Sequence, residues 1–503
     1  MTNREKYTRL SELLDEIEAY LRCLGKVQFD MECCAPEEGI AQAGEDMALV
    51  GKHVFALSHS PELQTLLCEL HEDSEGLTAL ERKTVEYEYR DYCRTKNFTP
   101  EFAFENDKVH SAAYGAWLSA KQKNDFSLFR DSLAAVIDIE RRAILLRDEQ
   151  KETVYDSMLD DFEEGGSIAQ LDSFFARLKE RIVPLVRRIA AEGKTIRTDF
   201  LSRSCDTAHQ EQMARYLLRV EGLRESALVL MTTEHPFTDH YGRSDVRVTT
   251  HYYEDAFLSS IYSTLHEGGH ALFMQNTPEE LYRHHVADRM TSAMHECISR
   301  FYENLIGRSE AFVKLVYPQL QSLAGGILDD VTAEEFYEGA NLVHPGLIRT
   351  ESDELTYCLH IIVRYELEKA FMNGEITVDE IPALWNAKYK EYLGVDVPDD
   401  AGGCLQDVHW TGGIAYFPSY ALGNAYGVQI LRVMQREFDV YSAVAAGELG
   451  KIRDWLTERV FASAPVSTPD EWIRSITGES LNPDYFLDYL EEKFTKLYAL
   501  EDK

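Results

Sequence analysis

The sequence predicts an all-α protein with one minor, short β-sheet. Charged and apolar residues alternate at the helical period through most of the chain, and helix-start signals recur along it. Only one short segment, residues 245–249, combines strand-like alternation with β-branched residues. With 503 residues and a hydrophobic fraction of 45%, the chain can bury an extensive core.

The first 230 residues are predicted to form one helix after another. Residues 1–24 carry apolar residues at helical spacing between frequent charges, which indicates an amphipathic helix and not a signal peptide. Ser60 and Thr99 each precede a proline and a glutamate, the order typical of a helix start. Further amphipathic helices are expected at 80–96, 111–123 and 171–192, with breaks at 34–46 and 163–167.

The second half begins with the predicted strand, whose edge could bind an extended peptide through its backbone. Helices are then expected over residues 256–275, from Thr277-Pro278-Glu279, and over 289–306. Thr332 opens a capping box, residues 396–403 form a loop rich in Pro, Gly and Asp, and Asn482 starts the final helix.

The segment 256–275 contains His266-Glu267-Gly268-Gly269-His270. Residues four apart share one face of a helix, so both imidazoles can reach one ion, and such a pair suits Zn2+. The glutamate beside the first histidine can accept a proton from water. The alternative is a chance match, since H-E-x-x-H is short. Two adjacent glycines weaken a helix, so they make sense if another backbone or a substrate passes close by.

A catalytic zinc site needs a third protein ligand, and Glu296 in the helix 289–306 is the candidate. The alternative for Glu296 is a solvated residue paired with Arg300 one turn later.

Three other regions carry candidate substrate-binding residues. His235 lies in a predicted turn, where a packed structural histidine is the simpler interpretation. Arg349 could pair with an acid or capture a terminal carboxylate with its forked guanidinium, and the residues alone do not decide. The stretch 403–424, rich in glycine and aromatic residues, is either a cleft lining or a core cluster.

Charge and cysteine content limit the partners. Acidic residues outnumber basic residues by 87 to 51, so the net charge of −36 argues against nucleic-acid and membrane-surface binding. Nine scattered cysteines do not form a disulfide framework, and no apolar run reaches the roughly 20 residues that cross a bilayer. A cytoplasmic protein is expected.

Several separated motifs resemble one family, the carboxypeptidase Taq family of metallocarboxypeptidases. The matching segments occur in the family order, and they are HPF at 235–237, D-x-R-x-T at 245–249, HEGGH at 266–270, an HES-x-x-R-like segment at 295–300, IR-x-x-x-D at 348–353 and G-x-x-Q-D-x-H-W at 403–410. Order and spacing agree over about residues 230–424, and the length suits nearly the whole chain. Two departures are Cys297, where serine is usual, and Ser352, where alanine is common. Cys297 could act as a stray soft ligand or an oxidation-sensitive group.

The resemblance implies a two-lobed helical zincin with a deep central groove, similar to neurolysin and angiotensin-converting enzyme. It implies one catalytic domain over residues 1–503, with a helical wall or lid at 1–230, an active-site portion at 231–425 and C-terminal helices at 426–503. It further implies a broad-specificity carboxypeptidase that acts on peptides, commonly a homodimer, with Zn2+ or Co2+ as the metal.

The resemblance also assigns roles to single residues. The implied metal ligands are His266, His270 and Glu296, and Glu267 is the catalytic acid and base. Arg349 matches the arginine that holds the substrate carboxylate. The remaining cleft positions are His235, His409 and Tyr420. Two other functions stay open: an endo-acting oligopeptidase of the same fold, and a peptide-binding protein with a structural metal.

Overall fold

The computed structural model describes residues 1–501, and it is built almost entirely from α-helices with one small sheet. The all-α class predicted from the sequence is therefore confirmed. Within these residues, no helix is both long enough and apolar enough to cross a bilayer.

Nine helices precede the sheet, and they are α1 (Asn3–Cys33), α2 (Ile40–Ser58), α3 (Pro61–Glu72), α4 (Ala79–Thr95), α5 (Pro100–Lys123), α6 (Ser127–Leu145), α7 (Val154–Phe162), α8 (Ile168–Glu192) and α9 (Thr207–Glu221) within the described part of the chain. The helices after the sheet are α10 (Phe257–Asn276), α11 (Glu279–Arg283), α12 (Ser292–Arg300), α13 (Glu310–Leu323), α14 (Ala333–Ala340), α15 (Tyr357–Met372), α16 (Ile381–Leu393), α17 (Phe417–Glu437), α18 (Val440–Ala445), α19 (Leu449–Leu456), α20 (Pro469–Thr477) and α21 (Pro483–Leu497).

Local capping chemistry sets most helix starts in the N-terminal half. The Ser60 hydroxyl accepts the Leu63 N–H at the start of α3, and the Thr99 hydroxyl accepts the Phe102 N–H at the start of α5, as predicted. The predicted break at 34–46 is too long, because a 3-10 turn at Glu37–Gly39 leads straight into α2 at Ile40. Ala41 and Ala43 in the first turn of α2 favour the helical conformation.

Two helix boundaries in the second half differ from the prediction. Pro278 is the N-cap of α11, so this helix begins at Glu279. The helix expected over 289–306 begins at Ser292 and continues beyond Arg300 as a π-helical turn, Phe301–Gly307. Such turns are rare and often occur at functional sites.

The sheet contains β1 (Leu228–Thr232), β2 (Thr238–His240) and β3 (Val246–Thr250) in the order β1-β3-β2. β1 runs parallel to β3, with Leu228 opposite Val246, and β2 runs antiparallel to it. The strand predicted at 245–249 is β3, which pairs on both sides. It therefore has no free edge, and the predicted docking edge is wrong for this strand. The edges belong to β1 and β2.

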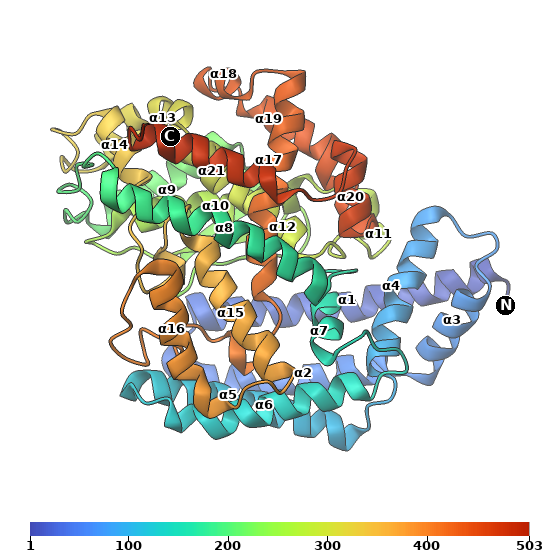
Figure 1. Cartoon of the computed structure of the whole chain (residues 1–503). Coiled ribbons are helices and arrows are strands. Elements are labelled where there is room, and N and C mark those ends of the chain that lie inside the picture. The colour runs from blue at the N-terminus through green and yellow to red at the C-terminus, as the bar shows by residue number, and fades with distance from the viewer. Residues whose placement is uncertain (502–503) are drawn as a thin grey trace.

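Helix α10 lies at the centre of the molecule. It packs against α9, α12 and β3, and α12 packs in turn against α17. Figure 1 shows α1, α2, α5 and α6 along one side and the C-terminal helices α18 to α21 along the other, with α10 and α12 between them. Each of the two central helices is therefore covered by protein from several directions.

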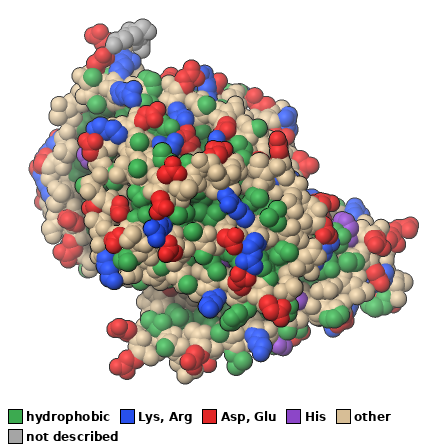
Figure 2. Space-filling view, turned by 60° about the horizontal axis from the view of Figure 1, so that its bottom comes forward, with side chains coloured by type: hydrophobic (Ala, Val, Ile, Leu, Met, Phe, Trp, Pro, Cys, Tyr) green, Lys and Arg blue, Asp and Glu red, His purple; other side chains and the backbone are tan. Residues whose placement is uncertain are grey.

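On the face drawn in Figure 2, acidic and basic side chains are interspersed with apolar patches.

Candidate functional site

The site forms where α10 crosses α12, and two glycines allow the close contact. A Cβ at Gly269 would lie 2.7 Å from Ser299 Cα on α12, and a Cβ at Gly268 would overlap the Glu221 carboxyl group on α9. The glycine pair therefore admits a second backbone on one side and a buried side chain on the other. One of the explanations considered from the sequence, the close passage of another backbone, is correct for Gly269.

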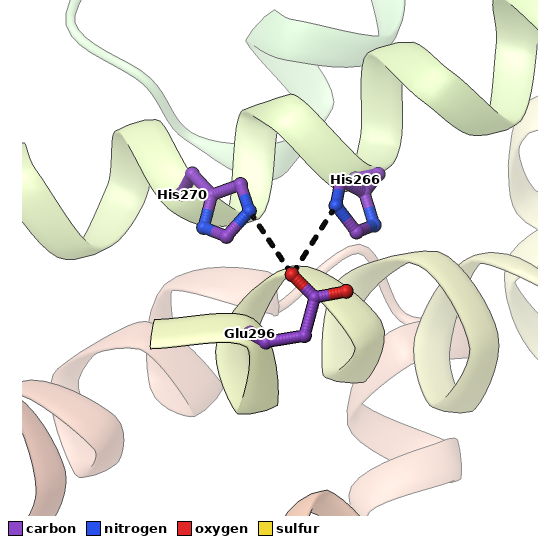
Figure 3. Close-up of side chains that lie close together, drawn as sticks. All are labelled: His266, His270 and Glu296. Carbon is purple, nitrogen blue, oxygen red and sulfur yellow. Dashed lines mark ion pairs between the residues drawn. The ribbon is translucent and has the colours of Figure 1, made fainter. Parts of the chain in front are cut away.

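The crossing brings together His266, His270 and Glu296 (Figure 3). Glu296 Oε2 lies 3.6 Å from His266 Nε2 and 3.5 Å from His270 Nε2. One ligand atom from each residue falls within 4.8 Å of the others. Atoms bound about 2.0–2.2 Å from a tetrahedral ion lie roughly 3.4 Å apart, so this spacing matches the spacing of metal ligands.

The outer nitrogen of each imidazole is held by a further side chain. His266 Nδ1 lies 3.0 Å from Glu303 Oε2, and His270 Nδ1 lies 2.6 Å from His295 Nδ1. Both histidines therefore direct Nε2 at the same point, an arrangement typical of the outer partners of metal ligands. Sequence reasoning missed Glu303, although it follows Glu296 by two helical turns and so lies on the same face.

Glu296 is buried, and its two oxygens serve different partners. Arg300 Nε donates to Oε1 at 2.8 Å, while Oε2 faces the imidazoles. Burial alone would raise the pKa of Glu296, but His266 and Arg300 outweigh burial and lower it. The predicted pairing with Arg300 is present, yet the glutamate is buried and not solvated. A Cβ at Gly423 would lie 2.9 Å from Glu296 Cβ, so α17 packs directly behind this residue.

The chemistry of this donor set fits a divalent cation. Burial on its own would lower the pKa of His266. The carboxylates of Glu296 and Glu303 raise this pKa by more than burial lowers it, so the net shift is upward. A site that favours a positive charge on an imidazole also favours a positive ion between the imidazoles. Two imidazoles and one carboxylate form a common ligand set for catalytic zinc.

Glu267 lies beside this centre and is also buried. Its Oε2 accepts a hydrogen bond from Thr238 Oγ1 at 2.6 Å, and the same hydroxyl lies 3.0 Å from the Glu267 carbonyl oxygen. Thr238 belongs to β2, so the small sheet fixes the orientation of this carboxylate. Sequence reasoning missed Thr238, which directly follows the HPF segment.

Arg349 lies in a buried cluster of charges. Its Nη2 lies 2.9 Å from Asp407 Oδ1, and Arg364 also donates to Asp407 through Nε at 2.6 Å. Two guanidinium groups share one carboxylate, so these three side chains carry a net charge of +1 (+2 − 1). Arg349 is thus an ion-pair partner, and the cluster still has an excess positive charge. Sequence reasoning missed Arg364, which only the fold brings to Asp407.

The aromatic candidates lie next to this cluster. His409 Nε2 lies 3.3 Å from Tyr420 Oη, and the Arg349 guanidinium carbon lies 4.9 Å from the centre of the Tyr420 ring. Burial and Arg349 lower the pKa of His409 to about 4, so this histidine is neutral at neutral pH. Burial raises the pKa of Tyr420, which keeps its phenol protonated. His235 is exposed, and it is a minor one of the neighbours that lower the pKa of His409.

The structure shows the environments of Cys297 and Ser352, the two departures from the family motifs. Cys297 is fully buried, and burial raises the pKa of its thiol, so it is a packed neutral thiol and not a ready ligand. Ser352 Oγ donates to the Arg349 carbonyl at 2.6 Å and so supports the backbone of that arginine. All nine cysteines are free.

A cavity of about 1410 Å3 is lined by residues of α4, α8, α17 and α20. It includes Leu422 and Tyr426 of α17, the helix that also carries Tyr420. The sequence-predicted site residues are not among the described residues that line it. The cavity and the candidate site therefore share one helix but are lined by different side chains.

Comparison with known proteins covers almost the whole chain. The family model described as carboxypeptidase Taq (M32) metallopeptidase matches residues 9–494. Carboxypeptidase 1 of Bacillus subtilis is 38% identical over 492 residues, which cover 97% of this chain and 98% of that protein. Thermostable carboxypeptidase 1 of Thermus thermophilus is 34% identical, over 99% of this chain and 100% of that protein.

Solved structures show the same fold. The M32 carboxypeptidase from Deinococcus radiodurans R1 superposes with a TM-score of 0.94 at 29% identity, covering 99% of this chain and 100% of that chain. The structure described as BsuCP superposes with a TM-score of 0.92 at 36% identity, over 98% and 100% of the two chains.

Proposed function

The chain belongs to the carboxypeptidase Taq (M32) family of metallopeptidases, and we propose how its residues remove the C-terminal residue of a peptide. The protein is a metal-dependent carboxypeptidase, a hydrolase. The endo-acting alternative is not favoured, because this chain matches two relatives named carboxypeptidase over nearly their full lengths.

The observation that carries the proposal is the convergence of three ligand atoms beside a buried glutamate. His266, His270 and Glu296 would hold the divalent ion, with Zn2+ favoured by this donor set and Co2+ as a second option. When bound, the ion supplies Lewis acidity, which polarises the scissile carbonyl and acidifies water.

Glu267 acts as the general base and then as the general acid. Thr238 holds its Oε2, so Oε1 is the oxygen that takes a proton from the attacking water. The same carboxyl group then delivers the proton to the leaving amine. Burial beside β2 keeps this proton away from bulk water.

Tyr420 stabilises the negative charge that develops on the carbonyl oxygen. Its phenol is protonated at neutral pH and can donate a hydrogen bond, and neutral His409 orients the phenol through their 3.3 Å contact. His235, which is exposed near His409, contacts the peptide at the entrance of the site.

Arg349 binds the terminal carboxylate of the substrate. The excess positive charge of the Arg349, Arg364 and Asp407 cluster attracts an anion, and a free carboxylate neutralises it. Only the last residue of a peptide carries a free main-chain carboxylate next to its peptide bond, so the arginine selects that bond.

Matched peptides that end in a free acid or an amide test this function. The wild type should cleave only the free acid, with successive loss of single residues in mass spectra. Arg349→Ala should raise KM for the free acid roughly 100-fold, the value of one or two charge-assisted hydrogen bonds. Glu267→Gln should lower kcat at least about 100-fold with the metal content unchanged. Equal cleavage of both peptides by the wild type would refute the role of Arg349, and an active Glu267→Gln variant would refute the role of Glu267.

We also propose that residues 1–503 act as one catalytic domain in a cytoplasmic homodimer that cleaves peptides broadly. The family match over residues 9–494 supports one domain, and nine free thiols fit a reducing compartment. Helix α2 has no buried residue although it is mostly apolar, and Leu49 is 72% exposed there. On a chain with a net charge of −36, a charge-poor apolar helix is a surface on which two copies can meet. Light scattering of the wild type and Leu49→Asp tests the dimer, and a monomeric wild type would refute it.

A further inference from the structure

Tyr357 lies between the candidate metal centre and the carboxylate-binding arginine. It is 4% exposed and is the first residue of α15. The guanidinium carbon of Arg300 lies 4.0 Å from the centre of its ring, and Arg349 Nη1 donates to its hydroxyl at 3.2 Å. One side chain thus contacts an arginine on its ring face and another at its hydroxyl.

Each of these arginines belongs to a different part of the site. Arg300 donates to Glu296 Oε1 at 2.8 Å and to Glu303 Oε2 at 2.9 Å, so it orients the groups around the metal ligands. Arg349 belongs to the cluster that would bind the substrate carboxylate. Tyr357 therefore connects the side chains around the metal ligands to the cluster proposed to bind the substrate carboxylate.

Other contacts prevent Tyr357 and Arg349 from shifting independently. Arg364, two turns later on α15, donates to Asp407, which in turn holds Arg349. The Tyr357 ring also meets the Tyr420 ring edge to face, with centroids 6.4 Å apart. A single helix, α15, thus holds Arg349 through two paths, one direct and one through Asp407.

We propose that Tyr357 is a positioning residue that sets the separation between the metal ligands and Arg349, and thereby restricts release to one residue at a time. This inference rests on the proposed role of Arg349. With the arginine held at a fixed distance, only the last peptide bond reaches Glu267. Without the phenol hydroxyl, Arg349 keeps Asp407 but loses its link to the metal side, so the bound carboxylate can shift.

Tyr357→Phe tests this directly, because it removes the hydroxyl and keeps the ring against Arg300. We expect KM for a free-acid peptide to rise roughly 10-fold, the value of one hydrogen bond to a charged group, with kcat changed less than about 2-fold. We also expect dipeptides to appear among the products in mass spectra. Metal affinity, measured by chelator competition, should stay within about 2-fold of the wild type because the contact with Arg300 remains.

Tyr365→Phe is the matched control. Tyr365 is a buried tyrosine on the same helix, and its hydroxyl donates to Asp172 Oδ1 at 2.8 Å. Loss of this hydroxyl should leave KM and the product pattern unchanged. Tyr357→Leu, which also loses the ring, should additionally weaken metal binding. If the Phe variant loses stability, amidated peptides serve as uncleaved competitors of a free-acid substrate. A rise in KM for the free acid, with an unchanged inhibition constant for the matched amide, still separates positioning from general damage.

Two outcomes would overturn the inference, and they differ from one another. If Arg349→Ala raises KM while Tyr357→Phe leaves both KM and single-residue release as in the wild type, Tyr357 does not set the register and the role of Arg349 stands. If Arg349→Ala itself leaves KM for free-acid peptides unchanged, the role of Arg349 fails, and the role of Tyr357 fails with it.

Discussion

Glu303→Gln tests whether the carboxylate behind His266 prepares that residue to bind metal. Glu303 Oε2 accepts from His266 Nδ1 at 3.0 Å and from Arg300 Nη1 at 2.9 Å. Glutamine keeps the size of the side chain and one acceptor oxygen but removes the negative charge. The substitution therefore isolates the electrostatic contribution of this carboxylate from its packing.

The expected magnitude follows from how the carboxylate is held. Burial would raise the pKa of Glu303, but Arg300 and His266 outweigh burial and lower it to about 2, so the group is ionised at neutral pH. Outer-shell partners of metal-binding histidines typically contribute 10- to 100-fold in metal affinity. We expect a loss in this range, equivalent to about 1.4 to 2.7 kcal/mol.

Competition between the protein and a chromophoric chelator for Zn2+ measures this affinity without any substrate. Glu310→Gln is the control, since Glu310 is partly exposed and pairs with Lys314 on the surface of α13. The control should bind Zn2+ as the wild type does. If Glu303→Gln bound Zn2+ within a factor of 2 of the wild type, Glu303 would not contribute to the site in the way that the geometry indicates.

Two further predictions concern packing and pH. Gly269→Ala should lower the free energy of unfolding by roughly 1–3 kcal/mol, because the new Cβ would lie 2.7 Å from Ser299 Cα. Gly115 has open space around it, so the control Gly115→Ala should be neutral or stabilising in the same urea titration. Equal effects of the two substitutions would contradict the close contact between α10 and α12. Burial raises the pKa of Glu163 to about 7. The native state therefore keeps a proton that the unfolded chain releases above about pH 4.5, and the free energy of unfolding falls as the pH rises from about 4.5 to about 7. Glu163→Gln should flatten this fall by about 3 kcal/mol in urea titrations at pH 4.5 and pH 8, whereas parallel pH profiles would contradict the raised pKa.

Local patterns in the sequence predict most of the helices, because capping and hydrophobic periodicity act within a few residues. Ser60, Thr99, Thr332 and Asn482 all cap helices as expected. Local patterns carry less information about the sheet. β2 has three residues, and its partner in β3 is determined by pairing across a turn and not by local composition.

The site residues likewise divide into those that local spacing predicts and those that only the fold brings together. His266 and His270 share a face because one helix carries both, so their spacing alone predicts the pair. The contact between His270 and His295 depends on the crossing of α10 and α12, and residues 25 apart give no local signal of it. The pairing of Arg349 with Asp407, 58 residues apart, likewise requires the fold. The sequence indicates these candidates through family motifs, but it does not indicate the charge balance of the cluster.

We expect His266, His270 and Glu296 to bind one divalent ion. Anomalous diffraction at the zinc edge, from crystals grown with stoichiometric Zn2+, would locate this ion. We predict one dominant peak about 2.0–2.2 Å from His266 Nε2, His270 Nε2 and Glu296 Oε2. A dominant peak elsewhere, with none between these three atoms, would contradict the account.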